Sequence, residues 1–388
     1  MLPRHVYVHV PFCARRCTYC DFAIAVRRVV PVDEYLAALG RELELRWGSE
    51  AREQVGGGPW TLDTLYFGGG TPSRLGAEGI ARAIDLVRRH AELAPGAEIT
   101  IEANPEDISA EEARGLGAAG VNRVSLGVQS FDDPTLAWMH RVHDAARAER
   151  AVEELRGAGI ENLSLDLIFA LPGESGTRSW ERDVELALAL EPAHVSLYGL
   201  TIEERTPLGR ARARGAVTEA EEERYESDFL HAHAAMTAAG LEHYEVSNFG
   251  RPGLRSRHNS AYWRLVPYAG LGPGAHELRV SAGEQRRRWN DSAYAGWVRR
   301  LAAGRDPVAG EESLDATNRV AEEVYLGMRT REGLVLRDGE IEHVAPWVEA
   351  GWGDLVRGPG GESILRPTPA GWLRLDALAA DLTAFRSR

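Results

Sequence analysis

Three cysteines near the start of the chain are the residues best suited to hold a metal. Cys13, Cys17 and Cys20 are the only cysteines among the 388 residues, and their spacing is C-x3-C-x2-C. Thiolates are soft ligands that suit iron–sulfur clusters or zinc. Three thiolates on a four-iron cube leave one iron free for an exogenous ligand. We therefore expect a [4Fe-4S] cluster with one open iron at this segment.

Two other interpretations of the cysteines stay open at this point. Structural zinc normally takes four Cys or His ligands, so a zinc site here needs a distant histidine. Three apolar thiols in a core are less compatible with the segment, because Arg15, Arg16, Thr18 and Asp21 make it polar. A disulfide framework is excluded, since that class uses many cysteines in even numbers.

Further polar residues and glycines occur where strand-like segments end. Gly68, Gly69, Gly70 and Thr71 follow one such segment, and three successive glycines let a backbone approach a ligand closely. Three apolar segments each carry one polar side chain near their end, and these are Glu102, Gln129 and Asp166. A single such residue is more often a cap or turn group, but three in succession favour a binding site.

The elements that must position these residues alternate between strand-like and helix-like patterns. The strand candidates are short segments rich in Val, Ile and Leu, namely His5–Val10, Asp63–Phe67, Glu98–Glu102, Arg123–Val128, Leu163–Ile168 and His194–Leu200. Such alternation predicts an α/β fold with a parallel sheet and helices outside it. About six units are visible, fewer than a full eight-unit barrel needs, so we expect a partial (β/α)6 TIM-like barrel.

The pattern changes after about Val246. A loop-rich stretch, Ser247–His276, is followed by helical segments near Tyr294–Leu301 and Thr317–Met328. The rest of the chain has the pattern of short helices and strands, which predicts a small α+β or winged-helix-like module. We expect two domains, residues 1–280 with the barrel and residues 281–388 as a smaller C-terminal domain.

Composition limits the classes of partner. The net charge is −13 at pH 7, and an acidic chain repels the phosphate backbone, so we expect no nucleic acid. All 45 basic residues are Arg, which removes Schiff-base chemistry. No apolar run approaches the roughly 20 residues of a membrane span. Because no secretory pattern is present either, we expect a cytoplasmic protein, for which peripheral membrane contact stays compatible.

The motifs together resemble those of the radical S-adenosylmethionine superfamily, and most closely the oxygen-independent coproporphyrinogen III oxidase family. The resemblance runs from Tyr7 to about His276. It implies that the open iron chelates S-adenosylmethionine, which an electron from the cluster cleaves to methionine and a 5′-deoxyadenosyl radical. An electron donor is then required. The resemblance assigns contacts with S-adenosylmethionine to Tyr7, Gly69, Gly70, Thr71, Glu102, Gln129, Arg141 and Asp166. For Arg141, a surface position at a helix start is the alternative.

Two features favour the heme-chaperone (HemW) branch of that family. The oxidases carry a fourth cysteine where this sequence has Phe22, and an N-terminal extension for which Tyr7 leaves no room. The string His258-Asn-Ser-Ala-Tyr262-Trp263 resembles the heme-associated motif H-N-x-x-Y-W of the chaperones. Imidazole is a common axial ligand of heme iron, and aromatic rings pack on porphyrins.

The sequence therefore predicts a protein that binds heme and passes it to an acceptor hemoprotein. By the resemblance His258, Tyr262 and Trp263 contact the heme, without a covalent thioether because every cysteine is assigned to the cluster. The alternative is an oxygen-independent coproporphyrinogen III dehydrogenase that uses the deoxyadenosyl radical. His276 and the basic run Arg286–Arg288 are weaker heme candidates, with turn chemistry and an exposed basic cluster as the simpler interpretations.

Overall fold

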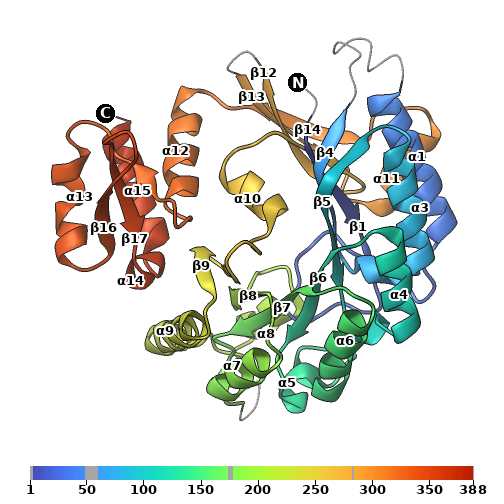
Figure 1. Ribbon diagram of the computed structural model, residues 1–388, viewed down its shortest axis with the longest axis horizontal. Coiled ribbons are helices and arrows are strands. Elements are labelled where there is room, and N and C mark those ends of the chain that lie inside the picture. The colour runs from blue at the N-terminus through green and yellow to red at the C-terminus, as the bar shows by residue number, and fades with distance from the viewer. Residues whose placement is uncertain (1–2, 49–59, 174–177, 282–283, 388) are drawn as a thin grey trace.

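One curved sheet of twelve strands dominates the structure (Figure 1). The computed structural model describes residues 3–48, 60–173, 178–281 and 284–387. The strand order is β14-β13-β12-β11-β1-β4-β5-β6-β7-β8-β10-β9. Seven neighbouring strands in the middle of the sheet run parallel. They are β11 (Tyr268–Leu271), β1 (His5–Val10), β4 (Thr61–Gly69), β5 (Glu92–Ala103), β6 (Arg123–Gln129), β7 (Asn162–Phe169) and β8 (His194–Gly199).

Helices between consecutive strands cover the outer, convex face of the sheet (Figure 1). They are α1 (Val32–Trp47), α3 (Gly76–Arg88), α4 (Ala110–Ala119), α5 (Asp133–Trp138), α6 (Ala145–Gly157), α7 (Trp180–Ala189) and α9 (Glu222–Ala238), with 3-10 turns η1 (Pro72–Leu75) and η2 (Pro105–Asp107). The short helix α8 (Pro207–Ala213) packs instead against the segment around Thr18 and Tyr19. The predicted α/β fold is confirmed. The sheet is curved and does not close among the described strands, which agrees with the expected partial barrel.

The first strand, β1, shows how the order of residues decides which side chains face the core and which face the concave side of the sheet. Successive side chains of a strand point to opposite faces. In β1 the residues Val6, Val8 and Val10 are fully buried in the main hydrophobic core. The alternate residues His5, Tyr7 and His9 line the concave side, where they meet polar groups. The inside of the partial barrel is therefore polar, and the apolar core lies between the sheet and its outer helices.

A short helix, α10 (Arg257–Trp263), lies within the concave side of the sheet (Figure 1). The Glu98 carboxylate accepts hydrogen bonds from the backbone N–H groups of Arg257 and His258 at 2.9 and 3.0 Å. A carboxylate at a helix N-terminus satisfies amides that have no partner within the helix. One end of the barrel interior is thus plugged by this helix.

Antiparallel strands extend both edges of the parallel sheet. One edge carries β12 (His276–Ser281), β13 (Glu284–Asn290) and β14 (Val308–Ser313), with α11 (Tyr294–Ala302) between the last two, and the other carries β10 (Asn248–Gly250) and β9 (Glu242–Glu245). The main sheet therefore continues to Ser313. The division of the chain into two domains is a proposal. The pairing of β13 and β14 with the main sheet favours a domain boundary after Ser313 over one at residue 280.

The C-terminal unit consists of a small sheet and four helices. Its elements are α12 (Ala316–Gly327), β15 (Leu334–Val335), α13 (Glu340–Glu349), β16 (Gly353–Arg357), β17 (Ser363–Pro367), α14 (Pro369–Trp372) and α15 (Leu375–Arg386). It meets the edge of the main sheet where the His243 and Trp372 ring centroids lie 3.8 Å apart. The backbone N–H of Val246 also donates to the Arg329 carbonyl at 2.9 Å.

Candidate functional site

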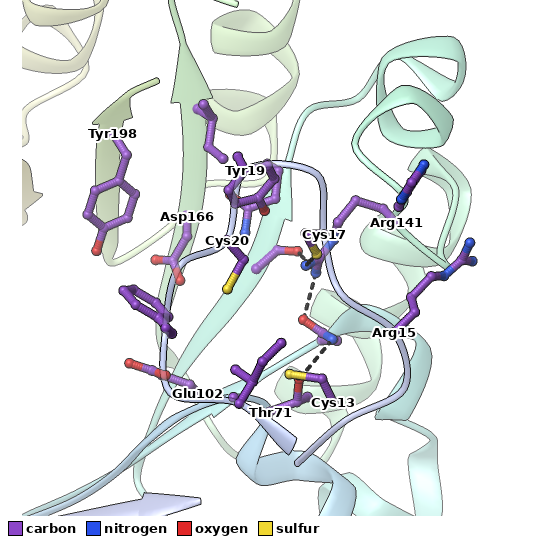
Figure 2. Close-up of a pocket in the computed structure, with 18 of the residues that line it drawn as sticks. Cys13, Arg15, Cys17, Tyr19, Cys20, Thr71, Glu102, Arg141, Asp166 and Tyr198 are labelled. Atoms are coloured by element: carbon purple, nitrogen blue, oxygen red, sulfur yellow. Dashed lines mark hydrogen bonds between the residues drawn. The ribbon is translucent and has the colours of Figure 1, made fainter. Parts of the chain in front are cut away.

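The largest concentration of predicted site residues surrounds a cavity of about 430 Å³ at the C-terminal ends of the parallel strands. In parallel sheets the loops after these strand ends carry the chemistry. Figure 2 shows residues of the cysteine loop facing strand-end residues across this cavity. The predicted residues that line it are Cys13, Cys17, Cys20, Gly69, Gly70, Thr71, Glu102, Gln129, Arg141 and Asp166. The structure therefore brings together ten residues taken from six segments of the chain.

The cysteine loop is tied at both ends. Its base is a pair of two-residue strands, β2 (Phe12–Cys13) and β3 (Ala25–Val26), which pair in parallel. Its middle is held by backbone bonds from Thr18 N–H to the Met139 carbonyl, at 3.3 Å, and from Leu208 N–H to the Thr18 carbonyl, at 2.8 Å. These bonds position the three thiols along the cavity wall, as labelled in Figure 2.

Two polar groups point at cysteine sulfurs. The Thr71 hydroxyl donates to Cys13 Sγ at 3.6 Å, and Arg141 Nη1 donates to Cys17 Sγ at 3.6 Å. Burial raises the pKa of Cys13 to about 11, while the Thr71 hydrogen bond acts in the opposite direction. Burial also raises the pKa of Cys20. Electropositive donors around thiolates stabilise the charged ligand form, so the surroundings suit sulfur ligands of a metal cluster.

The three thiols do not converge on one point. Across the described ranges, no group of three or more His, Cys, Asp or Glu side chains is arranged to hold a single metal ion. In a four-iron cluster each cysteine binds a different iron, so the cluster does not require such convergence. The zinc interpretation does require it, and it finds no support in this part of the structure.

The glycine segment after β4 forms the cavity floor at close range. A Cβ atom on Gly70 would lie 2.6 Å from the backbone carbonyl of Pro11, at the start of the cysteine loop. Gly69 has φ +115°, a conformation that other residues rarely adopt, and its N–H donates to Glu102 Oε2 at 2.9 Å. Glycine is therefore required here for close packing against the neighbouring loop, and its predicted approach to a ligand stays a prediction.

Glu102 and Asp166 are the predicted carboxyl residues among the five that line the cavity, the others being Asp21, Glu106 and Glu203. Glu102 accepts from Gly69 N–H and from the Tyr66 hydroxyl, at 2.9 Å each. Burial raises the pKa of Glu102 to about 7, against the effect of these two donors. Asp166 accepts from the Ser125 hydroxyl at 2.9 Å, and burial raises its pKa as well. Buried carboxylates with spare lone pairs are acceptors for ligand hydroxyl groups.

Arg141 is half-buried, lies before the start of α6 and is hydrogen-bonded to polar groups of the site, which does not favour the alternative of a surface position at a helix start. Its Nη2 donates to Asn104 Oδ1 at 2.6 Å and to the Gly127 carbonyl at 2.8 Å. Its Nε has no partner among the described residues, and the same holds for Gln129 Oε1, which lines the cavity. Buried polar atoms without partners are costly in a folded protein. Unused donors and acceptors beside a cavity indicate a site built for a polar ligand.

Sequence reasoning did not identify two residues that organise this site. Asn104 accepts from Arg141 and donates through Nδ2 to Thr71 Oγ1 at 3.4 Å, so it links two predicted residues. Tyr66 fixes the Glu102 carboxylate. The position of Asn104, two residues after Glu102 at the same strand end, is the signal that would have found it.

Tyr7 belongs to a neighbouring cavity of about 580 Å³ and lines it together with Gly69 and Glu102, which also line the first. Its hydroxyl lies 3.1 Å from His9 Nδ1.

The predicted heme residues lie apart from both cavities. His258 is 1% exposed, and its ring nitrogens lie 2.7 Å from Thr64 Oγ1 and 2.6 Å from the Tyr262 hydroxyl. Its ring also stacks on Tyr66, with centroids 4.9 Å apart. Trp263 ends the same helix. In this conformation the string holds α10 inside the barrel, and neither nitrogen of His258 is available to iron.

The weaker heme candidates, the basic run Arg286–Arg288 and His276, have different surroundings. Arg286, Arg287 and Arg288 form ion pairs with Glu311 of β14, Glu322 of α12 and Asp306 just before β14, respectively. Arg286 is exposed, as the simpler interpretation expected, and carboxylates of the protein balance the charges of all three. His276 is exposed and lines the second cavity.

Comparison with known proteins agrees with this arrangement. The family model described as the radical SAM superfamily matches residues 7–187, the region that carries the cavity. A Mycobacterium tuberculosis protein described as heme chaperone HemW is 41% identical over 338 residues, covering 86% of this chain and 83% of that protein. The chain belongs to the HemW family. A further HemW, from Synechocystis sp., is 37% identical and covers 86% of this chain and 80% of its own length.

A solved structure has the same fold as this chain. Coproporphyrinogen III oxidase (HemN) from Escherichia coli, described as a radical SAM enzyme, superimposes with a TM-score of 0.79 at 20% identity. The match covers 99% of this chain and 90% of HemN, so the two proteins share the fold. Among the described helices of this HemW-family chain, none is long and apolar enough to cross a bilayer.

Proposed function

We propose that this chain is a cytoplasmic heme chaperone that carries a [4Fe-4S] cluster and S-adenosylmethionine and delivers heme to an acceptor hemoprotein. The observation that carries the proposal is the identity of 37–41% to proteins described as heme chaperones, extending over more than four fifths of this chain. Heme, the acceptor and an electron donor are the partners that this function requires.

The residues around the first cavity fit both resident groups. Cys13, Cys17 and Cys20 would hold the cluster, because they are the only thiols and all three line one cavity. The free Nε of Arg141 and the unpartnered Oε1 of Gln129 would meet polar groups of S-adenosylmethionine. The Glu102 and Asp166 carboxyl groups would accept from its ribose. When bound, the cluster supplies one electron at a time to the bound cofactor.

The principal rival is an oxygen-independent coproporphyrinogen III dehydrogenase. The shared fold with HemN does not distinguish the two, since a fold hosts more than one function. Phe22 does favour the chaperone, because it occupies the place of the oxidases' fourth cysteine. Its side chain is 64% exposed at the rim of both cavities.

An anaerobic assay separates the two functions. The protein is reconstituted with iron and sulfide and incubated with coproporphyrinogen III, S-adenosylmethionine and dithionite. We expect a brown protein that binds added hemin, gives a Soret band and forms no protoporphyrinogen. The variant Cys17→Ser is expected to lose the broad cluster absorbance.

Three outcomes contradict the proposal. Stoichiometric protoporphyrinogen identifies the dehydrogenase, a colourless protein that retains zinc identifies a zinc site, and an absent Soret band removes the heme-carrying role.

A further inference from the structure

The base of the cysteine loop carries a group of exposed basic side chains. The short strands β2 and β3 pair in parallel, with Cys13 opposite Val26. Because parallel strands run in the same direction, the residues that follow them leave the pair at the same edge. Four exposed arginines follow these strands, namely Arg15 and Arg16 after β2 and Arg27 and Arg28 after β3. The two arginine pairs therefore begin beside the first cysteine.

These arginines are not neutralised by neighbouring carboxylates. Within the described part of the chain, none of the four guanidinium groups has a carboxylate at ion-pair distance. The stretch 15–28 contains four arginines and a single acidic residue, Asp21, so its net charge is +3, whereas the net charge of the whole chain is −13. An acidic partner is therefore repelled by the chain as a whole and attracted to this segment.

Exposed apolar side chains lie among the arginines. Phe22, Val26 and Val29 are 64%, 45% and 80% exposed. Apolar groups that stay exposed within a rim of charges mark interaction sites. We call these three residues and the four arginines the loop surface. In Figure 2 the Arg15 side chain points away from Asp166 and Tyr198, so the loop surface continues on the side of the loop that faces away from these strand-end residues.

The loop surface is fixed relative to the first thiol. The Arg27 backbone N–H donates to the Cys13 carbonyl at 3.0 Å. Arg74 Nη2 donates to the carbonyls of Arg27 and Arg28, at 3.1 and 3.2 Å. Arg74 belongs to η1, which follows Thr71, the residue whose hydroxyl donates to Cys13 Sγ. A partner that docks on the loop surface is therefore held at a defined place beside Cys13, without a loop to order first.

We propose that the loop surface is the docking site of the electron donor, and that this donor is an acidic protein that carries one electron at a time. The inference rests on the proposed function, because it requires the cluster on Cys13, Cys17 and Cys20. The reduced carrier loses one electron and is oxidised, and the cluster gains that electron and is reduced. No bond forms or breaks, and no proton is transferred.

The size of the apolar part also fits this kind of partner. Three apolar side chains make a small contact, and electron-transfer complexes belong to the smaller, transient interfaces. In such complexes complementary charge speeds the encounter more than it strengthens the complex. A carrier with a negative rim would meet the arginines, while its redox group would lie over Val26, the residue opposite Cys13.

The test compares reduction of the full-length, anaerobically reconstituted protein by two reductants of opposite charge. One is a reduced flavodoxin of negative net charge, and the other is reduced methyl viologen, a small cation that needs no docking site. Stopped-flow absorbance gives both rate constants, and calorimetry with oxidised flavodoxin gives the dissociation constant without any electron transfer. Retained cluster absorbance reports that each variant is folded.

Three variants separate the loop surface from the charge of the whole chain. The first replaces Arg16, Arg27 and Arg28 by Gln and spares Arg15, which also lines the cofactor cavity. Val29→Glu leaves every arginine in place and adds a carboxylate at the most exposed apolar position. The matched control makes the same change of charge at exposed arginines of other elements, by replacing Arg150 of α6, Arg357 of β16 and Arg366 of β17 with Gln.

We expect the first variant to lower the flavodoxin rate constant about tenfold or more at low ionic strength and to weaken flavodoxin binding, with no loss of rate for methyl viologen. Val29→Glu should change both flavodoxin readouts in the same direction, and the control should match the wild type. Salt should slow the flavodoxin reaction of the wild type between about 20 mM and about 500 mM NaCl, and should slow that of the first variant much less.

Four results contradict these expectations. If neither the first variant nor Val29→Glu changes the flavodoxin readouts while methyl viologen reduces the cluster, this inference alone is overturned. An equal loss of rate with both reductants assigns the arginines to the cluster rather than to docking, and an equal loss in the control assigns the effect to net charge. Binding of anionic phospholipid vesicles that the first variant loses, with flavodoxin unaffected, makes the loop surface a membrane contact. A wild type that assembles no cluster overturns the proposed function itself.

Discussion

We predict that the Glu102 carboxyl makes binding of the proposed cofactor, S-adenosylmethionine, depend on pH. Burial raises the pKa of this group from 4.5 to about 7, so the group keeps its proton in the free protein until the pH approaches neutrality. A protonated carboxyl is a weaker acceptor for ribose hydroxyl groups than a carboxylate. We therefore expect S-adenosylmethionine to bind preferentially to the ionised form of Glu102, which predominates above about pH 7.

The size of the effect follows from the ionised fraction. With a pKa of about 7, roughly one tenth of Glu102 is ionised near pH 6 and roughly nine tenths near pH 8. If only the carboxylate binds, the affinity rises about tenfold between these values, which is about 1.4 kcal/mol. The variant Glu102→Gln cannot ionise, so we expect its affinity to be low and independent of pH.

Anaerobic isothermal calorimetry of the reconstituted protein at a series of pH values measures this dependence. Asp166→Asn is the matched control, because it removes the carboxyl of the cavity whose charge acts on Glu102. The Asp166 charge contributes to raising the pKa of Glu102, so this variant should keep the pH dependence with a lower midpoint. A flat wild-type profile refutes the reasoning. A slope that persists in Glu102→Gln and vanishes in Asp166→Asn assigns the titration to Asp166 instead.

Four further predictions concern stability and the metal site. Because the folded pKa of Glu102 is raised, its contribution to stability is complete below about pH 4.5 and is lost by about pH 7; urea unfolding of wild type against Glu102→Gln should show a decline of up to about 3 kcal/mol. Gly70→Ala places a Cβ 2.6 Å from Pro11 and should lose cluster absorbance, whereas Gly157→Ala, with open space around it, should keep it. Thr71→Val removes the hydrogen bond to Cys13 Sγ and should lower the cluster reduction potential in a potentiometric titration, and an unchanged potential contradicts that role. Trp372→Ala should lower the free energy of unfolding by about 3–5 kcal/mol, while Leu355→Ala, 39% exposed, should cost far less.

Much of the fold was predictable because its signals are local. The alternation of Val6, Val8 and Val10 with His5, Tyr7 and His9 gives both the strand and its two faces, since side chains of a strand alternate. Strand ends next to glycine and proline indicated where the site would form. The extension of the sheet through β13 and β14 was not predictable in this way, because pairing between distant segments leaves little trace in either one.

The surroundings of the two candidate heme histidines could not be predicted from the sequence. The sequence ranked His258 above His276, because only His258 stands in the H-N-x-x-Y-W string. The structure separates them by environment, since one is buried in a hydrogen-bonded plug and the other faces a cavity. Burial and hydrogen bonding depend on α10 folding back into the barrel, which is a tertiary event.

By itself the sequence determined which reactive groups the protein has and the pattern of its elements. These are three thiols at fixed spacing, an alternation of strands and helices, and polar groups at strand ends. These properties are set by covalent spacing and by short-range periodicity. Only the tertiary structure decided which groups meet, that Arg141 lies against Cys17 and Asn104, and that Glu102 titrates near neutrality. The physical reason is that burial and hydrogen bonding come from segments tens to hundreds of residues apart, which the sequence does not place together.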